Sequence, residues 1–233
     1  MTEVEQVTPI DMEFKDVPIE SPKMHVATGK PGSGKTVLDF SIADIIHEEN
    51  DKDIYVIMKP YDRKLKQMAP GIPKHIKELR DLTRLSDESD NPLQDVILIG
   101  DDWKRIAHAR RAMSDINVVV DNLIGILRHD ELDIVLDDQT ASSIDKNNII
   151  RSNYLWVKPP FRKELELGRN AMLEEITLAF NLDMGQRDVL LYNEEVHDGP
   201  VFVHNIPLPS YWTEELSRMH RRQPRGFMRR LEL

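Results

Sequence analysis

The sequence predicts one α/β domain, with a mostly parallel central sheet flanked by helices and with a C-terminal β-hairpin and helix. Short apolar runs rich in β-branched residues alternate with stretches of helical periodicity, as is typical of a covered parallel sheet. A chain of 233 residues suits a single such domain, and its 40% hydrophobic residues are enough to form a sizeable core.

We expect three regions along the chain. Residues 1–22 are acidic, lack a periodic pattern and contain three prolines, so they are predicted to be an extended or disordered leader. Residues 23–210 would form the α/β domain, and residues 211–233 a basic C-terminal helix or tail.

Composition excludes several classes of protein. The chain has no cysteine, so disulfides, thiolate metal sites and a cysteine nucleophile are ruled out. No apolar run approaches the roughly 20 residues that span a bilayer, and the acidic start is unlike a secretory signal. The net charge of −10 argues against a generic basic coat for nucleic acid. We therefore expect an intracellular, soluble protein without a transmembrane segment.

A phosphate-binding loop follows the first predicted strand, at 24–28. The loop has the Walker A spacing G-x-x-x-x-G-K-[ST] and consists of Gly29, Lys30, Pro31, Gly32, Ser33, Gly34, Lys35 and Thr36. In this pattern backbone amides surround an anion, the lysine reaches the β- and γ-phosphates, and the threonine hydroxyl ligates Mg²⁺. The helix that follows, to about residue 50, adds the positive end of its dipole. The stretch predicts a site for a nucleoside triphosphate such as ATP, with Mg²⁺.

Acidic pairs end two later strands. A second strand is expected at 53–58 and a short polar helix at 74–85, and the strand at 95–100 ends in Asp101 and Asp102. Ligands bind at the carboxyl edge of open parallel sheets, so Asp101 is a candidate Mg²⁺ ligand and Asp102 a candidate base for water. The strand at 132–136 ends in Asp137 and Asp138 and fits the same description. From the residues alone, either pair could hold the metal.

The remaining elements complete the sheet. We expect helices at 103–112 and 117–127, a fifth strand at 154–157, a long helix at 161–180 and two hairpin strands at 188–193 and 201–205. A helix begins near residue 211.

The order of these motifs resembles the FtsK–HerA superfamily of DNA-pumping ATPases, which have a RecA-like P-loop fold. Between 24 and 157 the chain has the phosphate loop, a strand ending in Asp-Asp, an Arg-His pair, a strand closing on Gln, and Ile-Arg-x-Asn. The packaging ATPases of membrane-containing icosahedral viruses are the nearest in size and pattern, followed by the filamentous-phage assembly ATPases of the zonula occludens toxin type. The resemblance implies that Asp101 and Asp102 are the Walker B pair, Gln139 the polar sensor, and Arg128 a finger reaching a neighbouring subunit. Arg151 is the rival finger.

The same resemblance implies a function and partners. It implies Mg²⁺-dependent ATP hydrolysis coupled to DNA translocation, as in packaging a viral genome into a preformed capsid. The expected partners are double-stranded DNA, other copies of the chain in a pentameric or hexameric ring, and capsid or membrane vertex proteins. The expected location is the host cytoplasm, with association to the virion. Two alternatives stay open, a phage assembly or secretion ATPase and a small-molecule P-loop kinase.

The C-terminal end differs from the rest of the chain in charge. Six arginines lie within thirteen residues that contain no acid: Arg218, Arg221, Arg222, Arg225, Arg229 and Arg230. Without them the net charge of −10 becomes −16, so the tail is a separate basic segment. DNA phosphates or an acidic neighbouring subunit could receive it, and a solvated tail fits equally well.

Overall fold

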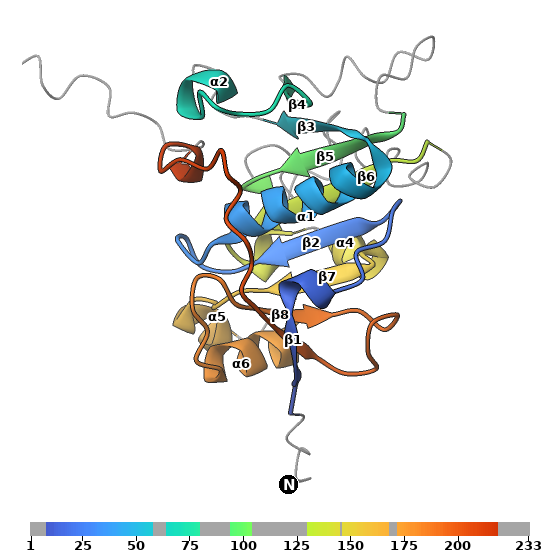
Figure 1. Ribbon diagram of the computed structural model, residues 1–233. Coiled ribbons are helices and arrows are strands. Elements are labelled where there is room, and N and C mark those ends of the chain that lie inside the picture. The colour runs from blue at the N-terminus through green and yellow to red at the C-terminus, as the bar shows by residue number, and fades with distance from the viewer. Residues whose placement is uncertain are drawn as a thin grey trace, which may run out of the picture.

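The structure is a computed structural model that describes residues 8–57, 64–79, 94–103, 130–144, 146–167 and 172–218 (Figure 1). The strands are β1 (Ile10–Glu13), β2 (Met24–Thr28), β3 (Asp53–Ile57), β4 (Ile76–Leu79), β5 (Val96–Gly100), β6 (Asp133–Asp138), β7 (Tyr154–Val157), β8 (Val189–Tyr192) and β9 (Val201–His204). The helices are α1 (Lys35–Asn50), α2 (Leu65–Met68), α4 (Lys146–Arg151), α5 (Arg162–Leu167) and α6 (Leu173–Asn181). Short 3₁₀ turns lie at Phe14–Asp16, Ala141–Ser143 and Leu216–Arg218.

The described strands form one nine-stranded sheet in the order β1-β9-β8-β7-β2-β6-β5-β3-β4. Every pair of neighbours is parallel except the two pairs that contain β8. The predicted α/β fold with a mostly parallel sheet and a C-terminal hairpin is confirmed. Because β6 lies between β2 and β5, the carboxyl ends of these three strands meet at one edge.

Both faces of the central strands are covered. Helix α1 lies across one face (Figure 1), where Phe40 and Ile42 pack with Val135 of β6. The neighbouring β6 residues Ile134 and Leu136 point to the other face. On that face α4 contacts β2 and α6 contacts β7. Burial on both faces explains why these strands are continuous apolar runs rather than alternating ones.

The described part of the leader predicted over residues 1–22 is partly extended, as expected, and packs against the rest of the chain. Strand β1 pairs in parallel with β9 at the edge of the sheet. Just after it, Phe14, Val17 and Ile19 are buried in the core. Residues 8–22 are thus part of the domain. Their buried residues are too widely spaced, and too interrupted by proline, to produce a periodic signal.

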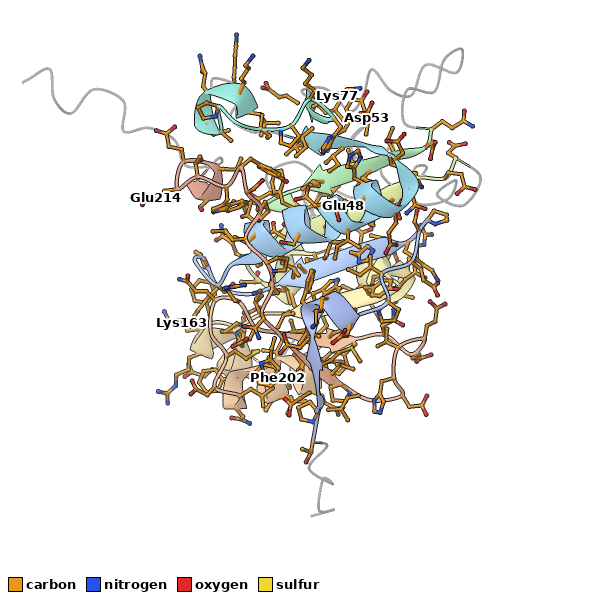
Figure 2. The ribbon with its side chains drawn as sticks, viewed as in Figure 1. Glu48, Asp53, Lys77, Lys163, Phe202 and Glu214 are labelled. Atoms are coloured by element: carbon orange, nitrogen blue, oxygen red, sulfur yellow. The ribbon has the colours of Figure 1, made fainter. Side chains whose placement is uncertain are left out.

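The region predicted as a helix at 74–85 is also different, because its described part contains strand β4. Only Ile76 of this strand is buried, and the strand pairs with β3 at the sheet edge. Figure 2 shows the Lys77 and Asp53 side chains together there, and they form an ion pair. Charged edge strands lack the alternating pattern by which strands are recognised.

Other predicted elements lie wholly or partly outside the described residues. These are the helices at 103–112 and 117–127, and the basic tail beyond residue 218. Helices α5 and α6 cover most of the long helix predicted at 161–180, with α6 ending one residue beyond it and residues 168–171 outside the described residues. None of the described helices is long and apolar enough to cross a membrane.

Candidate nucleotide-binding site

The glycine-rich loop connects β2 to α1 and packs closely against the segment that follows β7. Gly29 has φ +150° and Gly34 has φ +90°, values that favour glycine. A Cβ on Gly29 would lie 2.5 Å from the Cβ of Lys158, and one on Gly34 would lie 2.3 Å from the carbonyl oxygen of Gln186. The backbone amide of Lys30 donates to the Pro159 carbonyl at 2.9 Å, which ties the loop to this segment. These positions require glycine because neighbouring chain leaves no room for a side chain.

The two residues after the last loop glycine begin α1 and point toward the carboxyl edge of the sheet. Lys35 Nζ donates to the Gly29 carbonyl at 2.9 Å and lies 3.9 Å from Asp137 Oδ2. Thr36 Oγ1 donates to Asp101 Oδ1 at 3.0 Å. The hydroxyl and the carboxylate predicted as Mg²⁺ ligands are therefore neighbours in space, although 65 residues separate them in the chain.

The two acidic pairs occupy different places around this loop. Asp101 accepts the hydrogen bond from Thr36, while Asp137 accepts one from the backbone amide of Asp102. The side-chain Nε2 of Gln139 donates to Asp102 Oδ2 at 3.1 Å. The backbone amide of Gln139 donates to the carboxylate of Asp138. The structure brings Lys35, Thr36, both acidic pairs and Gln139 together.

One acidic residue of the site has no counterpart in the sequence-based prediction. Asp39 on α1 is fully buried, and its carboxylate lies with those of Asp101 and Asp137, the nearest oxygens of all three being within 4.8 Å of one another. Burial raises the pKa of Asp39 and of Asp137 well above the usual range, and the charge of Asp101 adds to both shifts. An aspartate on the apolar face of α1, between buried Leu38 and Phe40, is a sequence signal that could have indicated this position.

A second residue missed by the sequence reasoning is Lys158, directly after β7. Its side chain is fully buried, and Nζ donates to the Gln186 carbonyl at 2.8 Å. Burial lowers the pKa of Lys158 to about 7, an effect that the charges of Asp188 and Asp39 partly oppose. The sequence showed only that Pro159 and Pro160 end the strand.

A cavity of about 620 Å³ opens beside the loop, between the start of α1 and the C-terminal segment. Figure 1 shows this segment crossing in front of the sheet from β9 toward α2. Its contribution to the cavity wall is largely apolar, and the Trp212 ring packs edge-on against Phe40 with centroids 5.9 Å apart. The lining residues are Gly32, Gly34, Lys35, Thr36, Val37, Gln186, Arg187, Ile206, Leu208, Trp212, Glu214 and Ser217. Such a volume suits a small-molecule ligand.

The two candidate arginine fingers are not part of this cluster. Arg128 lies outside the described residues. Arg151 ends α4 at the opposite edge of the sheet, because Asn153 nearby exchanges hydrogen bonds with Met24 at the start of β2. Lys30, in the loop itself, has an exposed side chain.

No protein-family model and no curated protein sequence matches the chain. Among solved structures it is similar to the genome-packaging NTPase B204 from Sulfolobus turreted icosahedral virus 2 in complex with ATP-gammaS. The TM-score is 0.57, with 14% identity over 78% of this chain and 96% of that one. B204 from Sulfolobus turreted icosahedral virus, a DNA-packaging ATPase, gives a TM-score of 0.53 with 13% identity over 78% and 96% of the two chains.

A bacterial protein shares the architecture as well. EccC from Thermomonospora curvata (ATPases 2 and 3) has a TM-score of 0.50 and 14% identity, over 78% of this chain and 36% of that one. At such identities the likeness concerns the fold. The chain therefore has the fold of a P-loop NTPase, and in this fold it resembles viral genome-packaging ATPases.

Proposed function

We propose that the protein is a Mg²⁺-dependent ATPase that couples hydrolysis to the translocation of DNA, as a subunit of a viral genome-packaging motor. The observation that carries the proposal is the hydrogen bond of 3.0 Å from Thr36 Oγ1 to Asp101 Oδ1 beneath a glycine loop. It joins the two ligand types that P-loop NTPases use for magnesium, at the edge where the phosphates would lie. The likeness in fold to packaging NTPases supports the choice of DNA over a small-molecule acceptor.

Each residue around the loop has a role in this proposal. Lys35 neutralises the β- and γ-phosphates, and its present acceptors are backbone carbonyls of the loop itself. Asp102 orients and polarises the attacking water. Gln139, which is bonded to Asp102, senses the γ-phosphate and transmits its loss to β6.

The residues present fit a magnesium ion. Carboxylates and a hydroxyl are the oxygen ligands that Mg²⁺ prefers, and the buried oxygens of Asp39 have no hydrogen-bond donor among the described residues. Thr36 and Asp101 would hold the ion. When bound, Mg²⁺ neutralises charge on the phosphate oxygens.

The proposal includes assembly and partners. Arg128 would complete the site of a neighbouring subunit in a pentameric or hexameric ring, with Arg151 as the rival. Such a finger accelerates hydrolysis by roughly 10³- to 10⁵-fold, so activity would depend on assembly. The arginines from Arg218 to Arg230 would bind double-stranded DNA or an acidic subunit. The motor would act in the host cytoplasm at a capsid vertex.

The test is ATP hydrolysis at low salt, with and without double-stranded DNA, over a range of protein concentrations. We expect turnover per chain to rise with concentration and with DNA, and Lys35→Ala to reduce it at least 100-fold, which corresponds to about 2.7 kcal/mol. Lys66→Ala is the matched control because this lysine is exposed on α2 and belongs neither to the loop nor to the cavity lining. Absence of turnover at every concentration would refute an ATPase. Phosphate transfer to a small acceptor by a monomer would favour a kinase.

A further inference from the structure

We propose that Asp39, Asp101 and Asp137 form a site for one divalent cation, Mg²⁺ or Mn²⁺, that is filled before nucleotide binds. Thr36 and Asp101 are the expected magnesium ligands of a P-loop, whereas Asp39 and Asp137 belong to neither of the motifs assigned to the metal. The inference rests on the proposed function only in placing this ion beside the nucleotide.

Three separate elements bring the carboxylates together. Asp39 lies on α1, Asp101 follows β5, and Asp137 lies near the end of β6. One oxygen of each lies within 4.8 Å of an oxygen of the other two. Ligands on opposite sides of Mg²⁺ are about 4.2 Å apart, and those of a larger cation such as Ca²⁺ about 4.8 Å apart. One ion can bind all three carboxylates once their oxygens close in around it, because at most one pair of them can lie on opposite sides of the ion.

The burial of Asp39 is the observation that points to a ligand. The residue is 0% exposed, and neither carboxylate oxygen accepts a hydrogen bond from any part of the chain that the structure describes. A buried aspartate with a purely structural role accepts hydrogen bonds, because a desolvated carboxylate without them is strongly unfavourable. The carboxylate of Asp39 instead faces two others.

The nearby lysines do not neutralise the group. Lys35 Nζ is 3.9 Å from Asp137 and donates to a loop carbonyl, while Lys158 Nζ donates to the Gln186 carbonyl. Neither of these two described ammonium groups donates to Asp39. A divalent cation supplies the missing contact to Asp39 and places positive charge among the three carboxylates. The all-oxygen ligand set selects Mg²⁺ or Mn²⁺ over softer metals.

The test is a titration of the nucleotide-free protein with Mn²⁺. Binding is measured as the loss of the electron paramagnetic resonance signal of free Mn²⁺. We expect one Mn²⁺ per chain, competed by Mg²⁺, and an affinity at least tenfold lower in Asp39→Asn. Asp183→Asn, which changes an exposed aspartate, should bind like the parent. Failure of the parent to bind Mn²⁺ without nucleotide, or equal affinity in Asp39→Asn, would overturn the inference.

A second measurement does not depend on the variant folding. The midpoint of thermal unfolding of the unchanged protein without nucleotide should rise with millimolar Mg²⁺ but not with NaCl of equal ionic strength, since a ligand of the native state stabilises it. ATP hydrolysis on the same samples separates the two proposals. If the protein hydrolyses ATP but does not bind Mn²⁺ in the absence of nucleotide, only the cation site is refuted. If it binds Mn²⁺ through Asp39 but does not hydrolyse ATP, only the ATPase is refuted.

Discussion

Strand β6 places one buried aspartate at its first residue, Asp133, and another, Asp137, one residue before its last. Asp133 accepts hydrogen bonds from Ser21 Oγ at 2.7 Å, from the Lys23 amide at 2.8 Å and from Lys52 Nζ at 3.0 Å. Lys52 is itself buried and also donates to the Glu131 carbonyl. At this end of the strand the buried negative charge is matched by a buried positive one.

The other end of β6 lacks such a match. Asp137 lies with Asp39 and Asp101, and among the described residues Lys35 and Lys158 are the cations whose charges act on Asp39 and Asp137. A buried charge with a complete set of partners contributes to the fold, whereas an excess of one sign is retained where a ligand supplies the opposite charge. From the difference between the two ends of one strand, we expect Asp133 to be structural and Asp137 to serve the proposed function.

The largest effect on stability is expected at the matched end. Asp133→Ala should lower the free energy of unfolding by about 3–5 kcal/mol, because it removes the buried carboxylate bonded to Lys52 and leaves that ammonium with only the exposed Asp95 at 3.8 Å among the described carboxylates. Urea denaturation followed by circular dichroism measures this loss. Combining Asp133→Leu with Lys52→Met removes both charges and should recover most of it. A loss below about 1 kcal/mol in the single variant would mean that the pair is not structural.

At the carboxyl end of β6 we expect a substitution to stabilise the protein rather than destabilise it. In the presence of a chelator, Asp39→Asn should raise the free energy of unfolding by roughly 1–2 kcal/mol, since it removes one of three crowded negative charges and its amide can donate to a neighbouring carboxylate. The same urea experiment measures the change, with Asp183→Asn as the control for a surface substitution. Destabilisation by Asp39→Asn would show that the carboxylate has a structural role after all.

Motif order was sufficient to predict which motif residues lie together at the loop. The Walker A loop fixed Lys35 and Thr36, and parallel strands end at a common edge, so Asp101 and Gln139 could be expected beside them. The residues alone left open which acidic pair lies beside Thr36, because that depends on the order of the strands in the sheet. With β6 next to β2, Asp137 lies beside Lys35, and the Thr36 hydroxyl bonds to Asp101.

Residues without a motif could not be predicted. Lys158 and Trp212 come to the loop only through pairing of β7 with β2 and through the path of the C-terminal segment over α1. Asp39 belongs to no motif either, and its place between Leu38 and Phe40, which α1 buries, was a weak signal that motif-based reasoning did not use. Strand β4 was missed because an edge strand can be polar on both faces.

The cavity beside the loop offers the same kind of test for an apolar side chain, Trp212. Trp212 contributes to the cavity wall, and Trp212→Ala should weaken ATP binding by about tenfold, which is near the contribution of one aromatic contact. Titration with a fluorescent ATP analogue measures the affinity. Phe202→Ala is the control, since this partly buried aromatic lies on β9 (Figure 2) and is not among the residues that line the cavity. Equal losses in both variants would indicate a general loss of structure rather than a contact with nucleotide.

The smallest effect concerns Asp44 on α1. Its carboxylate accepts hydrogen bonds from one described donor, which is fewer than Asp133 has and more than Asp39 has. Tyr211 Oη donates to its two oxygens at 2.8 and 2.9 Å, yet burial still raises the pKa of Asp44 to about 6. The folded state thus favours the protonated acid, a contribution fully present below about pH 4 and lost as the pH rises through about 6. With allowance for partial exposure to solvent, we expect a decline of about 1 kcal/mol over this range that Asp44→Asn abolishes. Urea denaturation at a series of pH values tests it, and a pH dependence unchanged in Asp44→Asn would assign the decline to other carboxyl groups.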